Sequence, residues 1–193
     1  AARQRTAEIS DHMKVSDIVA KTLREHGFRH VFAISGGASL HLIHSIAETP
    51  GLEIVCPQHE QAGAMAADAY SRLTSGRGCA VATSGPGATN LITGIAGAYY
   101  DSVPALFLTG NVARFRDKGD TGVRQMGFQE TEFVEMCRSI TNYAVKISDA
   151  RSVRRVLLEA LYCSKKGRPG PVVVDIPDDI QRADVDEADL EMW

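Results

Sequence analysis

Hydrophobic and polar positions along this chain alternate between two periods. Residues 15–27 carry apolar side chains every three or four positions and end at Gly27, which is typical of an amphipathic helix. The run HVFAI follows at once and is short and continuously apolar, as in a strand buried on both faces. Segments with the helical period and short apolar segments continue to alternate in this way as far as residue 177.

This alternation predicts an α/β fold. We expect helices at 15–27, 36–48, 59–75, 87–101, 130–138 and 149–167, and strands at 30–34, 52–56, 79–84, 104–109, 142–147 and 171–177. Strict alternation favours a six-stranded parallel sheet with helices on both faces, a flavodoxin-like architecture.

Three segments follow from the same pattern. The polar residues 1–13 have no apolar period and are predicted to be a flexible N-terminal lead-in. Residues 14–182 form the predicted domain, and the acidic residues 183–193 are expected to be a linker toward a further, central domain. Within the domain, the polar stretch from Gly110 to Gln129 is long enough to be a candidate functional loop.

Composition narrows the function classes. A net charge of −3 and an aromatic content of 6% argue against a nucleic-acid partner, and no apolar run reaches the ~20 residues that cross a bilayer. The four cysteines have no metal-ligand spacing, and Cys56 and Cys79 lie in apolar runs, so we expect buried free thiols there. A cytoplasmic location is the resulting expectation.

Four polar or glycine-rich segments follow predicted strands: SGGAS, PQHEQ, TSGPGATN and TGN. Ligands of open parallel sheets bind beyond the carboxyl ends of the strands, so these segments are expected to meet at one site. Each taken alone is also compatible with a simple tight turn before a packed helix.

The position of Glu60 in the sequence has two interpretations. A carboxylate in the first turn of a helix is favoured by the helix dipole, which is the ordinary explanation. However, the helix that follows is rich in alanine and glycine, and such a surface allows a helix or another chain to approach closely. A carboxylate beside that contact would be partly desolvated and suited to hold or move a proton.

The long loop carries four cations, Arg114, Arg116, Lys118 and Arg124. They form either a solvated basic loop or a group that steers an anionic substrate.

Taken together, the motifs resemble a known family. The ordered segments HEQAGAMAADAYSR, GCAVATSGPGATNLITGIAGAYYDSVPALFLTGN and GFQE are similar to the N-terminal pyrimidine-binding (PYR) domain of thiamine diphosphate enzymes, in the acetolactate synthase-like branch. The resemblance covers roughly residues 14–184, and it depends on the combination of motifs in this order.

The resemblance implies a catalytic role for Glu60. In this family the matching glutamate hydrogen-bonds N1′ of the cofactor's aminopyrimidine and favours its imino form, which takes the proton from C2 of the thiazolium. The implied activity is that of a lyase or transferase, a decarboxylase or carboligase acting on a 2-oxo acid such as pyruvate.

The resemblance also assigns the remaining site residues. Matching positions near the cofactor are Ile34, Ser35, Gly36, Gly37, Ala38, Pro86, Asn90 and Gln129, and those near the substrate are Phe128 and Gln129. Two positions depart from the family pattern. Ile34 and Ser35 replace a frequent aromatic–proline pair, and the sequence RQMG replaces a GTDA-type stretch.

The family binds the diphosphate and Mg²⁺ through a second domain that carries a GDG motif and a following Asn, and this chain has neither in that arrangement. The resemblance therefore implies half of an active site, inactive alone and completed in a homodimer or homotetramer, with FAD left open as a further cofactor. Two alternatives remain: a natural small subunit of a split enzyme, and a non-catalytic flavodoxin-like nucleotide-binding module.

Overall fold

A single parallel sheet lies at the centre of the computed structural model, which describes residues 12–193. Its six strands follow the order β3-β2-β4-β5-β7-β6, and every neighbouring pair is parallel. The strands are β2 (His30–Ala33), β3 (Glu53–Val55), β4 (Gly78–Ala82), β5 (Ala105–Asn111), β6 (Tyr143–Lys146) and β7 (Val172–Pro177). The predicted fold class is confirmed.

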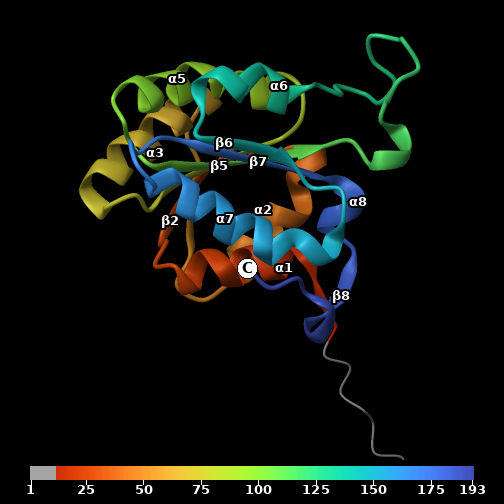
Figure 1. Cartoon of the computed structure of the whole chain (residues 1–193), viewed down its shortest axis with the longest axis horizontal. Helices are drawn as coiled ribbons and strands as arrows, with labels where there is room; N and C mark the ends of the chain where they lie inside the picture. Colours follow the sequence, from red (N-terminus) through yellow and green to blue (C-terminus); the bar gives the residue numbers. More distant parts are fainter. Residues whose placement is uncertain (1–11) are drawn as a thin grey trace, which may run out of the picture.

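Helices cover both faces of this sheet (Figure 1). One face carries α1 (Val15–Glu25), α2 (Leu40–Glu48) and α7 (Val153–Lys165); the other carries α3 (Glu60–Thr74), α4 (Pro86–Thr89), α5 (Ile92–Tyr100) and α6 (Phe133–Cys137). Two separate buried clusters result. Along β7, Val172 and Val174 pack into the first cluster and Val173 into the second, as the two-residue period of a strand requires.

The acidic C-terminal segment departs from the prediction. Residues 183–193 follow α8 (Asp178–Gln181) and contain β8 (Asp184–Asp186), which pairs antiparallel with β1 (His12–Lys14). Val185 and Leu190 are buried in the first cluster. Residues 184–190 are therefore packed on the domain, because alternate apolar side chains find a distant partner strand that local pattern does not reveal.

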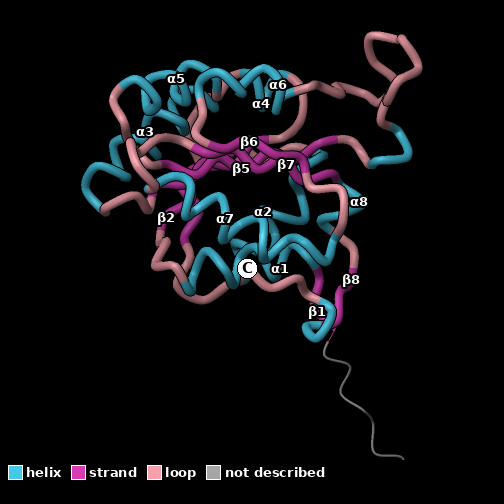
Figure 2. The backbone as a smooth tube through the Cα atoms, in the orientation of Figure 1, coloured by secondary structure: helices cyan, strands magenta, loops and turns pink. Residues whose placement is uncertain are grey.

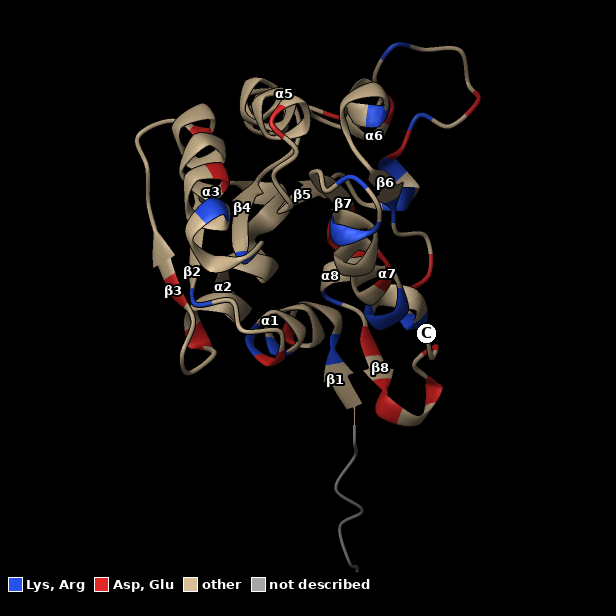
Figure 3. Cartoon of the chain, turned by 60° about the vertical axis from the view of Figure 1, so that its left-hand side comes forward, with Lys and Arg blue, Asp and Glu red and all other residues tan. Residues whose placement is uncertain are grey.

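Ion pairs also attach this segment to α7. Arg154 pairs with Glu187 at 3.3 Å and Arg155 with Glu191 at 2.6 Å, and Figure 3 shows the red turn after β8 near the blue segments of α7. His12 and Met13 pair with β8, so the folded domain begins before residue 14, the start that the sequence predicted. The rest of the predicted lead-in, residues 1–11, lies outside the described residues.

Two smaller predictions need correction. The helix expected at 87–101 is interrupted at Asn90 and Leu91, which separate α4 from α5. Cys79 is buried as expected, but Cys56 is exposed because β3, the edge strand, ends at Val55 before it.

The loop predicted at 110–129 corresponds to residues 112–132 between β5 and α6, because Gly110 and Asn111 belong to β5. Figure 2 shows this long loop extending away from the sheet. It contains a 3-10 turn at Arg114–Arg116 and no further helix or strand. No helix within residues 12–193 is long and apolar enough to span a membrane.

Candidate functional site

A cleft of about 450 Å³ opens at the carboxyl ends of β2, β4, β5 and β7. It brings together five of the predicted site residues, Gly36, Gly37, Ala38, Phe128 and Gln129. The other lining residues are Thr83, Ser84, Asn111, Val112, Ala113, Phe115, Arg116, Asp178 and Arg182. The predicted convergence of strand ends therefore exists, but Ile34, Ser35, Pro86, Asn90 and Glu60 do not line this cleft.

The glycine turn at one wall of the cleft is held from both sides. The N–H of Ala38 donates to Thr83 Oγ1 at 3.1 Å, and its carbonyl accepts from Gln181 Nε2 at 2.6 Å. Gln181 is completely buried and also donates to the carbonyl of Ile176 at 2.7 Å. Gly110 packs so closely on Ala38 that a Cβ there would collide with the Ala38 carbonyl. Both backbone groups of Ala38 are thus fixed.

Glu60 is the first residue of α3, so the dipole explanation holds for it. His59 precedes it as the N-cap, and its ring accepts from the N–H of Gln61 at 3.1 Å. The Glu60 side chain has a specific partner as well, because Oε2 accepts from Asn90 Nδ2 at 2.9 Å. The structure thereby brings together two residues that are thirty positions apart in the sequence.

A bare glycine separates Glu60 from the cleft wall. A Cβ placed on Gly87 would lie 2.7 Å from Thr83 Cγ2 and 3.5 Å from Glu60 Oε1. Thr83 lines the cleft and Glu60 does not, so Gly87 marks the space between the two. Any larger residue at this position would displace Thr83 and fill the space beside the carboxylate.

The motifs SGPG and FQE touch each other directly. Gln129 has a φ of +58°, an uncommon left-handed conformation for a residue with a side chain. Gly85 faces it with a φ of +59°, and a Cβ on Gly85 would lie 2.7 Å from Gln129 Cβ. The contact places the backbone of Gln129 at the cleft and leaves Phe128 84% exposed beside it.

Glu130 organises the long loop, a role that the sequence did not reveal. Its buried carboxylate accepts three backbone N–H groups, from Lys118 at 2.7 Å, Met126 at 2.9 Å and Gly127 at 3.1 Å. Burial alone would raise the pKa of Glu130, but these three donors together lower it below its ordinary value. The ionised carboxylate of Glu130 therefore holds these separate parts of the loop together through the three hydrogen bonds.

A second buried acid lies beneath the cleft floor. Asp175 on β7 accepts from Thr109 Oγ1 and from Asn111 Nδ2, each at 2.7 Å. Burial raises the pKa of Asp175 to about 6 in spite of these two donors. Asn111 lines the cleft and also donates to the carbonyl of Thr131 at 3.2 Å, so the network joins the sheet to the far end of the long loop.

The small residues of α3 have a role within the chain. Gly63, Ala64, Ala67 and Ser71 are its buried face, and Ala64 packs against Gly94 of α5. Of the two expected partners, a helix of the same chain therefore covers this buried face. Ala62 and Ala69 remain exposed, together with Met65, which is 48% exposed.

The described residues were also searched for side-chain clusters that could hold a metal ion. Across residues 12–193, no group of three or more His, Cys, Asp or Glu side chains is arranged to hold an ion. His41, one of the two histidines on α2, lies 3.9 Å from Asp178 at the rim of the cleft.

The chain was compared with models of protein families and with curated proteins, and both comparisons find relatives. Residues 13–136 match the family model "Thiamine pyrophosphate enzyme, N-terminal TPP binding domain". Curated relatives include acetolactate synthase 2 of Nicotiana tabacum, 43% identical over 88% of this chain, and a synthase of Arabidopsis thaliana, 42% identical over the same share. Acetolactate synthase 2 of Zea mays is 44% identical over 88% of the chain. The chain spans about a quarter of their length, 24% to 26%.

Proposed function

Since the chain belongs to the thiamine pyrophosphate enzymes, as an acetolactate synthase-like N-terminal domain, we propose that it supplies the carboxylate that activates the cofactor. Thiamine pyrophosphate and thiamine diphosphate are the same compound. The single observation that carries the proposal is the pair formed by Glu60 and Asn90 beside the bare backbone of Gly87. The activity of the complete enzyme is part of the proposal, because the matched relatives are about four times longer than this chain.

The donor set suits the pyrimidine end of the cofactor. An aminopyrimidine ring is flat and polar at its edge, and it needs a carboxyl partner together with close backbone approach. Glu60 offers the carboxyl group, and Gly87 leaves beside Oε1 the space that a side chain would otherwise fill. The glycines at 36 and 37 likewise keep the cleft wall thin.

Asn90 positions the proton carrier. Because its amide donates to Oε2, the carboxylate is oriented and Oε1 is left to face the space beside Gly87. We propose that Glu60 holds a proton there, at the pyrimidine ring nitrogen, and that Asn90 keeps the geometry during proton transfer. When bound, the cofactor supplies the electron sink for decarboxylation of a 2-oxo acid such as pyruvate.

The cleft next to this pair is the proposed substrate side. Phe128 and Gln129 line it, and the contact of Gln129 with Gly85 ties their position to the turn that leads to Asn90. Ile34, Ser35 and Pro86 border the same two turns and remain predicted cofactor neighbours.

A second domain or subunit is proposed to bind the diphosphate and Mg²⁺. A homodimer or homotetramer would then enclose Glu60, and the exposed Ala62, Met65 and Ala69 on α3 are the surface we propose for close approach. We further propose a cytoplasmic location, with FAD left open as an additional cofactor.

The proposal is tested by Glu60→Gln in the complete enzyme. Turnover of 2-oxo acids should fall by at least about a hundredfold, because amide nitrogen cannot exchange the proton, while circular dichroism and cofactor affinity change little. Glu53→Gln is the matched control, since Glu53 is exposed on β3 and should leave turnover unchanged.

Two other results would redirect the assignment. Near-normal turnover of Glu60→Gln would remove the catalytic role. Tight binding of a nucleotide, with no thiamine diphosphate bound in the presence of Mg²⁺ and the complementary domain, would favour a nucleotide-binding module.

A further inference from the structure

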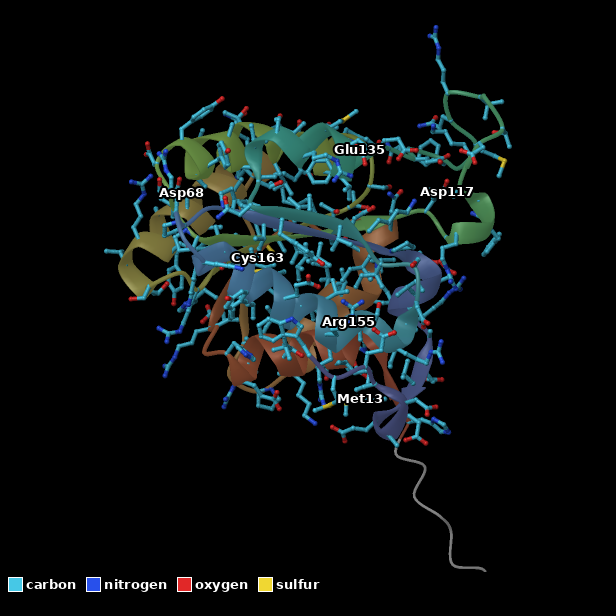
Figure 4. All side chains as sticks on the ribbon, viewed as in Figure 1. Met13, Asp68, Asp117, Glu135, Arg155 and Cys163 are labelled. Atoms are coloured by element: carbon cyan, nitrogen blue, oxygen red, sulfur yellow. The ribbon has the colours of Figure 1, made fainter. Side chains whose placement is uncertain are left out.

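The cations of the long loop differ sharply in their surroundings. Arg114 Nε donates to Asp179 Oδ2 at 2.7 Å, and Lys118 Nζ lies 3.3 Å from Glu132 Oε1. The loop's own Asp117, labelled in Figure 4, forms an ion pair with Lys146 of β6. These pairs attach the loop to the domain. The charges of Arg114 and Lys118 are therefore already paired with carboxylates of this chain.

Arg116 is different, because it lines the cleft without such a partner. In the part of the chain that the structure describes, no carboxylate lies within ion-pair distance of its guanidinium. Its Cζ lies 5.5 Å from the centroid of the Phe115 ring, a cation–π contact that holds the charge beside the cleft. The other arginine at the cleft, Arg182, is paired with Asp178 at 3.4 Å.

The surroundings of Arg116 favour recognition of an anion. Phe115 and Phe128 line the same cleft and are 67% and 84% exposed, so a ligand that fills the cleft covers aromatic surface and excludes water around the guanidinium. A guanidinium presents a planar fork of donors that matches a carboxylate, and the bond strengthens as water is removed.

We propose that Arg116 binds a second carboxylate of the substrate, at the end away from the reacting carbonyl. This rests on the proposed function and specifies its substrate class as 2-oxo dicarboxylic acids. The carboxylate that leaves as CO₂ loses its charge on the way to the transition state. A cation beside that group would stabilise the ground state more than the transition state. An arginine therefore favours the reaction only if it binds a carboxylate that remains on the substrate.

The test compares Arg116→Gln with Arg124→Gln in the complete enzyme. Arg124 is an exposed cation of the same loop that does not line the cleft, so it controls for net charge. For 2-oxoglutarate, Arg116→Gln should lower kcat/KM at least about tenfold, mainly through KM, because one charge-assisted pair is lost. For pyruvate, which has no second carboxylate, the loss caused by Arg116→Gln should be at least about threefold smaller than for 2-oxoglutarate, whereas Arg124→Gln should stay within about twofold of the parent enzyme for both substrates. Arg116→Lys should restore part of the loss.

Equal effects of Arg116→Gln on 2-oxoglutarate and pyruvate would overturn the inference, as would equal effects of the two variants. Calorimetric titration with glutarate, an unreactive dicarboxylate, separates this inference from the proposed function. If the enzyme turns over no 2-oxo acid, glutarate binding that is lost in Arg116→Gln and kept in Arg124→Gln still supports the anion site. No glutarate binding by the parent enzyme contradicts it.

Discussion

Two buried carboxylates show that surroundings, and not burial alone, set the charge of an acid here. Glu130 accepts three backbone N–H groups, which lower its pKa, whereas Asp175 receives two side-chain donors that do not offset its burial. Glu130 is thus held as an anion within the long loop. Asp175, between Thr109 and Asn111, takes up a proton near pH 6.

Asp175 predicts a specific pH dependence of stability. Its pKa is about 6 in the folded chain against an ordinary 3.8, so between these values the folded state holds a proton that the unfolded state has lost. The contribution is complete below pH 3.8 and is lost as the pH rises to about 6, by roughly 3 kcal/mol. Asp175→Asn removes this titration.

Denaturant unfolding of the parent and of Asp175→Asn, measured from pH 4 to pH 7, checks this. The difference in the free energy of unfolding between the two should shift in favour of the Asn variant as the pH rises. Parallel profiles for the two proteins would mean that Asp175 does not titrate in this range.

At the scale of elements, the packing of α3 on α5 places Glu60 relative to the sheet. Gly94 of α5 lies against Ala64, and a Cβ on Gly94 would lie only 3.0 Å from the Ala64 carbonyl carbon. Gly97, three residues later on the same helix, is open: beyond its chain neighbours and the backbone of its own helix, no atom lies within 4 Å of the position of a Cβ. The two glycines therefore differ in packing while sharing the helical environment.

These glycines are expected to respond in opposite directions to alanine. Gly97→Ala should stabilise the protein by up to about 1 kcal/mol, because alanine favours the helix. Gly94→Ala should destabilise it by about 1–3 kcal/mol, because the backbone of α3 must move away. Thermal unfolding of both variants provides the comparison, and equal shifts in Tm would show that the close α3–α5 contact is not important.

At the scale of the whole molecule, the last residues complete the domain. Val185 packs into the core cluster below the sheet, and the β1–β8 pair brings both ends of the described chain together. Figure 1 shows β8 at the base of the molecule, on the same side as α1 and α7. The segment after α8 therefore contributes to stability.

Val185→Ala is predicted to lower the free energy of unfolding by about 1–3 kcal/mol, because it removes buried methyl groups and leaves a cavity. Asp184→Ala, at the exposed neighbouring position on β8, should change it by no more than about 0.5 kcal/mol. Denaturant unfolding of the two variants measures this. A negligible effect of Val185→Ala would mean that the strand pair adds no stability.

The sequence predicted the central sheet because each strand and helix carries its own period. The rule that the carboxyl ends of parallel strands meet predicted that the turns after β2 and β4 lie at one site, and Gly36–Ala38, Thr83 and Ser84 do line one cleft. Phe128 and Gln129 line the same cleft, but only the family resemblance pointed to them. It did not predict Gln181 beside Ala38, or β8 beside β1, because these contacts join segments that are distant in the sequence and leave no local period.

Hydrogen–deuterium exchange at C2 of thiamine diphosphate, bound to the complete enzyme, tests whether Glu60 activates the cofactor as proposed. Rapid quench followed by NMR gives the exchange rate for the parent enzyme and for Glu60→Gln. If Glu60 has this role, Glu60→Gln slows exchange by at least about a hundredfold while the cofactor stays bound. An unchanged exchange rate, with full cofactor occupancy, would contradict it.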